Sequence, residues 1–304
     1  MVQVSILLLT KNGRNDLAQS LPILFAQNID VSFEVIVVDS GSTDGTLDLV
    51  HDFPVQLRQI RSDEFHHART RNFAASLAQG EIIVFLSQDA IPDSTNWLAA
   101  MVANFQDPQV GAVYGRQLPK RDSSLERQDV LHAIYGETRI VKDPAQRGSL
   151  GYRFYHFSDV NAAMRHTVWQ SARFPEDLKV FEDLGIAKHI LDRGWKIVYE
   201  PRAAVFHSHV HTTIGLFKRY FDIGYTFRLL RIWEAPGIRK SLLRDGWRLM
   251  NQKIKRRAGP KGGRSVGYGI RQDLAKSAGL LLGLNENRLP LILKRRLSAY
   301  RVFG

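Results

Sequence analysis

The chain has 304 residues, 44% of them hydrophobic and 24% charged, which suits a folded α/β domain with an appended segment. It contains no cysteine, which excludes a disulfide scaffold and a cysteine-based zinc site. The net charge of +12 is uneven, because residues 207–304 hold 21 Lys and Arg against 5 Asp and Glu, whereas residues 1–206 hold 21 against 25. This asymmetry indicates an anionic partner of the second segment, either a membrane or a nucleic acid.

The first hundred residues alternate between strand-like and helix-like segments. Apolar runs predict buried strands at 2–9, 33–38 and 81–86, with a shorter strand at 55–60. Helical patterns occupy 16–27, capped by Asn15 or Asp16, then 46–53 and 67–78, the last ended by Gly80. This alternation predicts a mostly parallel sheet with helices on both faces.

The remaining two thirds of the chain are less regular. We expect short strands at 110–114, 159–163, 196–200 and 203–207, and helices at 182–193 and from Ile214 onward. Residues 118–155 are polar with weak periodicity and predict a mobile loop over the site, and residues 256–269 resemble a linker. The chain starts without signal-peptide features and has no apolar run near the roughly 20 residues of a spanning helix. We therefore expect a cytoplasmic protein.

Polar clusters follow the three long apolar strands, at residues 10–12, 39–44 and 87–89. Ligands of parallel sheets bind beyond the carboxyl ends of the strands, so we expect these clusters to converge. Asp39 precedes a glycine-rich turn, where its carboxylate can accept from a base N–H or a ribose hydroxyl, or can cap the next helix. Asp89 can hold a divalent cation against a diphosphate, or can belong to the start of the helix that follows.

The second half of the chain carries two further candidate groups. Glu182 and Asp183 begin a predicted helix, where they either complement the helix dipole or supply a general base. His207 and His209 alternate at a strand end and share a face, so one imidazole can join a metal site, or both are ordinary surface residues. Arg71, in the predicted helix at 67–78, can offset phosphate charge or be solvated.

Taken in order, these motifs resemble those of the family 2 glycosyltransferases, which have the GT-A fold. VVDSGSTDGT is similar to the family's nucleotide-binding turn, and HHARTRNFAASLAQGEIIVFLSQDA to the helix and strand that lead into its metal motif. FEDLGIAKHILDRGWKIVYEPRAAVFHSH is similar to its Glu-Asp catalytic motif and late metal-site histidine. The similarity runs from Val4 to about Tyr225. FHHARTRN, FLSQDA, VYGRQLP and FKRYFDIG further resemble bacterial rhamnosyltransferases of surface-polysaccharide assembly.

The resemblance implies an inverting hexosyltransferase with a Rossmann-like GT-A domain at residues 1–215 and a basic, amphipathic helical region at 216–304. It implies a nucleotide-diphosphate sugar as donor, specifically dTDP-L-rhamnose, and assigns donor contacts to Thr10, Asn12, Asp39, Ser42, Arg71, Gln88 and Asp89. It also implies a Mg²⁺ or Mn²⁺ ion on Asp89 and His207, with Asp183 as general base and Glu182 orienting the acceptor or Asp183. The family's usual metal motif is Asp-x-Asp, so Ser87 in place of the first Asp puts strict metal dependence in doubt.

Acceptor contacts and the membrane complete the expected partners. We expect a saccharide acceptor, lipid-linked, near Arg116, Gln117, Asn161 and Trp195, although Trp195 can equally be a core residue. Residues 219–261 interleave basic and apolar side chains, which is typical of a helix lying on an anionic membrane surface. This predicts peripheral association with the inner face of the cell membrane, and a solvated face or a protein contact is the alternative.

Two rival interpretations remain. The basic segment by itself also suits a nucleic-acid-binding protein, but the chain lacks an aromatic stacking motif, and its strand-end carboxylates would repel phosphate unless a cation lies between them. We therefore expect no nucleic acid partner. A catalytically inactive sugar-nucleotide-binding protein is suggested by Ser87 and opposed by Asp183.

Overall fold

The computed structural model describes residues 2–120, 123, 125–148, 150–209, 212–241, 244, 263–300, 302 and 303. The chain divides into two compact units. The first comprises Met1–Ala145, Phe157–Asp177 and Glu182–Ser208, and the second comprises Gln146–His156, Leu178–Phe181 and His209–Gly304. The boundary after residue 215, which rests on the motif order, stays a prediction.

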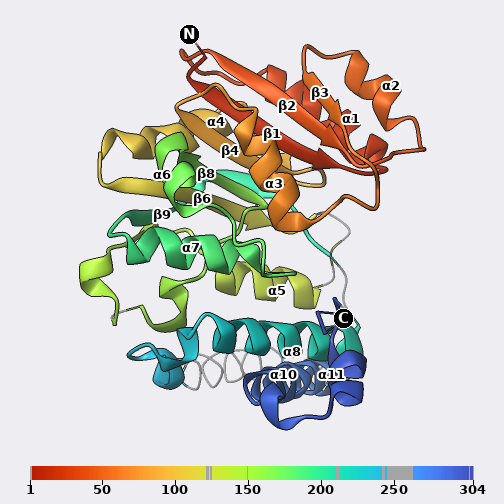
Figure 1. Cartoon of the computed structure of the whole chain (residues 1–304), viewed down its shortest axis with the longest axis vertical. Coiled ribbons are helices and arrows are strands. Elements are labelled where there is room, and N and C mark those ends of the chain that lie inside the picture. Colours follow the sequence, from red (N-terminus) through yellow and green to blue (C-terminus); the bar gives the residue numbers. More distant parts are fainter. Residues whose placement is uncertain are drawn as a thin grey trace. The chain divides into compact units, whose positions relative to one another are not determined.

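The first unit is built on a nine-stranded sheet with the order β3-β2-β1-β4-β8-β6-β9-β5, and β7 pairs with β9 (Figure 1). The strands are β1 (Val4–Thr10), β2 (Phe33–Asp39), β3 (Gln56–Gln59), β4 (Ile82–Ser87), β5 (Ile91–Pro92), β6 (Val110–Leu118), β7 (Ile140–Lys142), β8 (Asn161–Arg165) and β9 (Lys196–Phe206). Strands β1 to β4, β6 and β9 run in one direction, and β5, β7 and β8 run in the other. The mostly parallel α/β sheet is therefore confirmed.

Helices of the first unit flank this sheet. They are α1 (Arg14–Phe25), α2 (Thr46–His51), α3 (His67–Ser76), α4 (Trp97–Val102), α5 (Leu125–Ile134), α6 (His166–Ala172) and α7 (Glu182–Asp192), with a 3-10 turn η1 (Ala103–Gln106) after α4. A further 3-10 turn, η2 (Pro144–Gln146), follows β7. The helices and strands expected in the first hundred residues are all present, within a few residues of their expected bounds.

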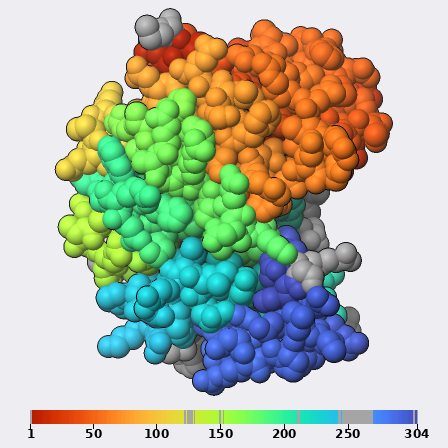
Figure 2. All heavy atoms as spheres, viewed as in Figure 1, coloured from red at the N-terminus to blue at the C-terminus, as the bar shows by residue number. Residues whose placement is uncertain are grey.

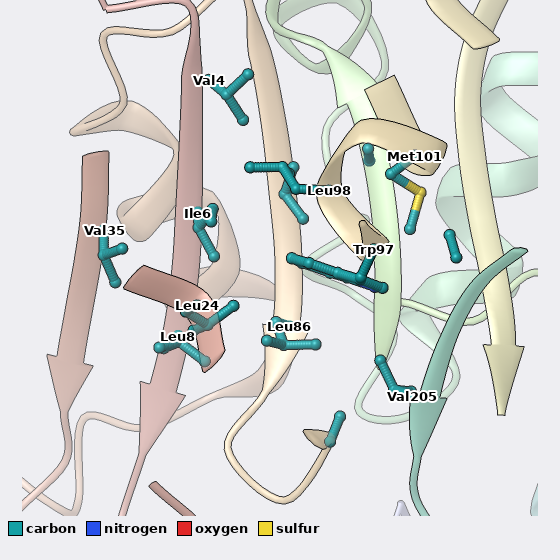
Figure 3. Close-up of a cluster of buried hydrophobic side chains, with 14 of the residues drawn as sticks. Val4, Ile6, Leu8, Leu24, Val35, Leu86, Trp97, Leu98, Met101 and Val205 are labelled. Carbon is teal, nitrogen blue, oxygen red and sulfur yellow. The ribbon is translucent and has the colours of Figure 1, made fainter. Parts of the chain in front are cut away.

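Alternation along the strands assigns their side chains to opposite faces of the sheet. Ile6 and Leu8 of β1 belong to the main buried cluster, together with Leu24 of α1 and Trp97 of α4 (Figure 3). Leu7 of β1 points to the other face, against which α3 packs. Burying a side chain of this size stabilises the fold by about 1.5–3 kcal/mol. Packing on both faces therefore stabilises the strands whose ends carry the candidate site.

Two expectations about local structure were wrong. The segment 118–155 is not a mobile loop, because it contains α5 and β7, and Lys142 of β7 is buried with its ammonium over the Tyr114 ring. Its polar composition concealed partners that lie far along the chain, in β6 and β9. The two strands expected at 196–200 and 203–207 form one strand, β9, whose register against β6 shifts between Gly115 and Arg116.

Helix α1 also starts earlier than expected, at Arg14 instead of residue 16. Its N-cap residue is Gly13, which has no side chain to accept a hydrogen bond. Asn15 and Asp16 lie inside the helix, so neither is the N-cap. The first backbone N–H groups are satisfied instead from the turn after β2, since Gly13 N donates to Thr46 Oγ1 at 3.0 Å and Arg14 N donates to Asp44 Oδ2 at 3.2 Å. A cap supplied by a distant segment leaves no local sequence signal.

The second unit is helical where it is described. Its elements are η3 (Gly151–Phe154), α8 (Thr213–Leu229), η4 (Ile232–Glu234), α10 (Gly263–Leu284), η5 (Glu286–Arg288) and α11 (Leu291–Leu297). Helices α8 and α10 lie against each other, cyan beside blue in Figure 2. Their backbones approach so closely that a Cβ at Gly279 or Gly283 would clash with the α8 backbone, which explains the small residues in α10.

The structure describes only part of the basic segment at residues 219–261, which was expected to lie on a membrane surface. Most of the basic and apolar stretch KSLLRDGWRLMNQKIKRR, residues 240–257, lies outside the described residues. Within α8, Arg228 pairs with Glu286 and Arg219 lies over the Phe181 ring, so both are engaged inside the second unit. Among the described residues, no helix is both long enough and apolar enough to cross a bilayer.

Candidate active site

A cavity of about 270 Å³ opens beyond the carboxyl ends of β1 and β4 in the first unit. It is lined by Leu7, Leu9, Thr10, Lys11, Ser40, Ser62, Phe65, His67, Arg71, Phe85, Leu86, Ser87, Gln88, Asp89 and Asp159. The polar clusters at 10–12, 39–44 and 87–89 therefore meet at one edge of the sheet, as expected. Of the expected donor-binding residues, Thr10, Arg71, Gln88 and Asp89 line the cavity itself.

Asp39 organises the turn that follows β2. Its Oδ1 accepts from Gly41 N at 2.9 Å and from Ser42 N at 3.0 Å, and the Ser42 hydroxyl donates to Oδ2. Gly41 has a φ of +88°, a conformation that L residues rarely adopt. Asn12 N donates to Ser42 Oγ at 2.8 Å, and Asn12 Oδ1 accepts from Thr43 N at 2.8 Å. Asp39 thus shapes a rigid turn that joins the ends of β1 and β2.

Gln88 joins the ends of β1 and β4. Its Oε1 accepts from Thr10 Oγ1 at 2.7 Å and from Lys11 N at 2.9 Å, while its Nε2 donates to Lys11 O at 3.2 Å. A Cβ at Gly13 would lie 2.6 Å from the same Oε1, so a larger residue at this position would displace the Gln88 amide. The amide of Gln88 therefore holds the floor of the cavity in place.

Asp89 and His207 form a candidate cation site. Asp89 Oδ2 lies 3.4 Å from His207 Nε2, and the two residues belong to a group whose ligand atoms are close enough to share a metal ion. The other ring nitrogen, Nδ1, lies 2.9 Å from Gln117 Oε1, while Gln117 Nε2 donates to Tyr135 Oη at 2.8 Å and to Ser158 Oγ at 2.9 Å.

The Gln117 amide determines which nitrogen of His207 can bind a cation. Because Gln117 Oε1 can only accept, His207 Nδ1 must donate, and in the neutral ring Nε2 then presents a lone pair toward Asp89. Two acceptors 3.4 Å apart repel unless a proton or a cation lies between them. An imidazole nitrogen and a carboxylate oxygen, oriented from behind by an amide, fit a divalent cation well. His209 belongs to the second unit.

A buried ion cluster lies at the other side of the cavity. Arg71 of α3 donates through Nη1 to Glu182 Oε1 at 2.7 Å, and its Nε lies 2.8 Å from Asp159 Oδ2. Arg71 Nη2 reaches Asp159 Oδ1 at 3.3 Å, so the guanidinium binds Asp159 with two nitrogens. All three side chains are at most 13% exposed. Arg71 is therefore fully engaged by carboxylates, whereas the sequence suggested a contact to the donor.

Asp159 is the residue of this cluster that the sequence analysis missed. It lies two residues before β8, which runs antiparallel to β4. The amino end of an antiparallel strand lies at the same edge as the carboxyl ends of its parallel neighbours. A search for carboxylates after strands overlooks such a residue, although Asp159 is the first residue of the strand expected at 159–163. The signal is a carboxylate at the start of a strand instead of at its end.

The surroundings of this cluster raise the pKa values of Asp183 and Asp159. Burial raises the pKa of Asp183 well above the usual range, and the negative charges of Asp159 and Glu182 raise it further. Burial also raises the pKa of Asp159 to about 6, opposed by Arg71. His67 is affected in the other direction, because burial and the Arg71 charge lower its pKa to about 4. Asp183, half-buried at the first turn of α7, is thus the strongest proton acceptor among these groups.

The four expected acceptor residues lie in different surroundings. Asn161 is fully buried, where its Oδ1 accepts from Trp97 Nε1 at 2.9 Å and its Nδ2 donates to Ala203 O at 2.9 Å, so it is a core residue. Trp195 precedes β9 and packs on Gly111, at the sheet edge opposite the cavity. Gln117 supports His207. Arg116 is bridged to Glu137 at 3.4 Å, and its Nε is buried with no hydrogen-bond partner among the described residues.

Comparisons with known proteins identify the class to which this fold and site belong. Residues 5–171 match the family described as Glycosyl transferase family 2. The chain is 32% identical over 283 residues to the O-antigen chain rhamnosyltransferase RfbN of Salmonella typhimurium, covering 89% of this chain and 86% of RfbN. It is 31% identical over 291 residues to WbaN of Salmonella anatum, also an O-antigen chain rhamnosyltransferase, covering 92% and 88%. The chain belongs to glycosyltransferase family 2 and is a glycosyltransferase.

Solved structures show the same fold. S. aureus TarS 1–349 in complex with UDP-GlcNAc has a TM-score of 0.60 at 18% identity, covering 98% of this chain and 84% of that chain. The mannosyltransferase PcManGT from Pyrobaculum calidifontis, in complex with GDP-Man and Mn²⁺, has a TM-score of 0.57 at 20% identity, covering 99% and 84%. These similarities establish the GT-A fold.

Proposed function

We propose that the chain transfers L-rhamnose from dTDP-L-rhamnose to a hydroxyl of a saccharide acceptor, in the synthesis of a cell-surface polysaccharide. The observation that carries this proposal is the identity of 31–32% to two O-antigen chain rhamnosyltransferases over about nine tenths of the chain. The edge of the sheet supports it, because it combines a cavity, a candidate cation site and a carboxyl group of raised pKa.

In the proposed donor complex, the nucleobase lies near Thr10 and Asn12 and the turn shaped by Asp39 and Ser42 holds the nucleoside. Asp89 and His207 would hold a Mg²⁺ or Mn²⁺ ion. When bound there, such an ion offsets the negative charge that develops on the leaving diphosphate. Gln117 keeps the Nε2 lone pair of His207 available for this role. Arg116, through its buried Nε, remains a candidate contact to the acceptor, whereas Asn161 and Trp195 do not enter the proposal.

Asp183 is the proposed general base. It accepts the proton of the acceptor hydroxyl as that oxygen bonds to the anomeric carbon and the bond to the diphosphate oxygen breaks. The single displacement inverts the anomeric configuration. Raised proton affinity makes a carboxylate more effective in this step, because the best catalytic pKa lies near the working pH.

A donor panel tests the sugar and nucleotide assignment. Purified chain is incubated with dTDP-L-rhamnose, dTDP-glucose, UDP-GlcNAc or GDP-mannose, with and without Mn²⁺, and its melting temperature is recorded. A specific donor stabilises the folded state by mass action, by about 2.7 kcal/mol when its concentration is 100 times Kd. We expect the largest shift with dTDP-L-rhamnose. A larger shift with a UDP- or GDP-sugar would refute the donor assignment.

We further propose that the second unit attaches the enzyme to the anionic inner face of the cell membrane, where a lipid-linked acceptor is found. Leu291, Ile292 and Leu293 of α11 are all exposed, and the exposed Arg295 and Arg296 follow after Lys294. Apolar side chains beside arginines suit the boundary between acyl chains and anionic headgroups. Each basic residue near such a surface contributes about 1 kcal/mol.

Liposome sedimentation tests the membrane proposal. We expect the chain to pellet with vesicles containing phosphatidylglycerol and to stay in the supernatant with phosphatidylcholine alone. Ile292→Asp should abolish pelleting. Ile214→Asp is the matched control, because Ile214 is equally exposed in the same unit but belongs to α8. Equal binding to both vesicle types, or loss of binding in both variants, would contradict a surface at α11.

A further inference from the structure

Arg71 joins three separate elements of the first unit. It projects from α3, binds Asp159 in front of β8 through two nitrogens, and binds Glu182 at the first residue of α7. A planar guanidinium fork fixes its partners in direction as well as in distance, which a lysine ammonium does not. The residue that follows Glu182 is Asp183. The start of α7 is therefore tied to α3 and β8 directly beside the proposed base.

The cluster holds more negative than positive charge. Among the described residues, Arg71 of α3, Asp159 before β8 and Glu182 of α7 act electrostatically on Asp183, and His67 of α3 acts on Asp159. His67 is neutral near pH 7, because its pKa is lowered to about 4. One guanidinium thus faces three carboxyl groups. A contact of Arg71 with the donor diphosphate would compete with both carboxylates for the same guanidinium, and weakening a buried ion pair is costly.

We propose that Arg71, Asp159 and Glu182 form a positioning cluster, which holds Asp183 toward the acceptor and sets its charge environment, and that Arg71 does not bind the donor. This inference rests on the proposed role of Asp183 as general base. It adds Asp159 to the residues needed for turnover and changes the role of Arg71 from donor binding to positioning.

The proposal predicts opposite shifts of one pH profile in two variants. Turnover requires Asp183 as a carboxylate, so kcat falls as the pH falls through the pKa of Asp183. Asp159→Asn removes a negative neighbour, which lowers that pKa and moves the acid limb of the profile to lower pH. Arg71→Met removes a positive neighbour, which raises the pKa and moves the acid limb to higher pH. A merely structural role would reduce the rate without moving the limb.

A third variant separates positioning from donor binding. Arg71→Lys keeps the charge but loses the fork, so we expect kcat to fall by about 10- to 100-fold while KM for the donor stays within twofold. If Arg71 held the diphosphate, KM for the donor would rise instead. Glu200→Gln is the matched control, because Glu200 is also buried and paired with an arginine, Arg202, but does not line the cavity.

The experiment measures kcat and KM against pH for the full chain, these four variants and Asp183→Asn, with thermal melts to confirm folding. Opposite displacement of the acid limb in Asp159→Asn and Arg71→Met, with none in Glu200→Gln, supports the proposal. An unmoved limb in every variant that folds, or a raised donor KM in Arg71→Lys at unchanged kcat, overturns it. Wild-type turnover in Asp183→Asn would instead refute the general base itself, so the two failures are distinguishable.

Discussion

Two carboxylate sites at the same edge of the sheet are balanced in different ways. Asp159 and Glu182 are paired with a cation of the protein itself, the guanidinium of Arg71. Asp89 faces the Nε2 of His207, whose other nitrogen is held by Gln117. The first arrangement keeps its charge internal and leaves Asp183 as a proton acceptor, whereas the second offers ligand atoms to an external cation. Under the proposed roles of these residues, acceptor chemistry and donor binding would occupy separate halves of the site.

The strongest test of this division is Asp183→Asn. Loss of a positioned base costs about 10²–10⁴-fold in rate, so kcat should fall by that much while donor affinity is unchanged. Turnover kinetics and calorimetric titration of the donor measure the two effects separately. Asp192→Asn, at the end of the same helix, is the control and should retain activity, because Asp192 pairs with Lys188 on the helix surface. Weakened donor binding in Asp183→Asn would contradict the assignment of Asp183 to acceptor chemistry alone.

Asp89→Ala tests the other half. Changing a residue that only orients a metal ligand costs about 10- to 100-fold in metal affinity. Removing the ligand itself should cost more, so Mn²⁺-dependent binding of the nucleotide should weaken by roughly 100-fold or more. Titration with dTDP in the presence and absence of Mn²⁺ measures the effect. Asp93→Ala, four residues along the chain and exposed, should bind as the wild type does. Metal-independent binding that Asp89→Ala leaves intact would remove the cation from the donor site.

Gln117→Leu should give the smallest effect and sharpens the comparison. The substitution removes the acceptor that holds the Nδ1 proton of His207, so the ring can turn or change tautomer. We expect metal affinity to fall by about 10- to 100-fold, with the acid limb of the kcat profile unmoved. Gln109→Leu, at an exposed glutamine paired with Lys196, is the control. A shifted acid limb in Gln117→Leu would show that the two halves are electrostatically coupled.

Much of the amino-terminal half could be predicted from the sequence. Long apolar strands such as β1, β2 and β4 are recognisable because they are buried on both faces, and the polar residues after them share one edge by geometry alone. The structure was predicted less well where a residue's contacts lie far away along the chain. Lys142, within a segment expected to be a loop, is buried with its ammonium over the Tyr114 ring. The residues next to Lys142 in the sequence do not indicate that contact.

The sequence by itself determined the class of the fold, the motif order and the identity of Asp89, Asp183 and His207 as candidates, because these depend on periodicity and on short-range spacing. Only the tertiary structure decided what each side chain does. The antiparallel direction of β8 brings Asp159 to the site. Long-range packing pairs Arg71 with Asp159, places Gln117 against His207 and buries Asn161 in the core. Pairing across about 90 residues, as between Arg71 and Asp159, leaves no trace in a local pattern, because it exists only once the sheet has formed.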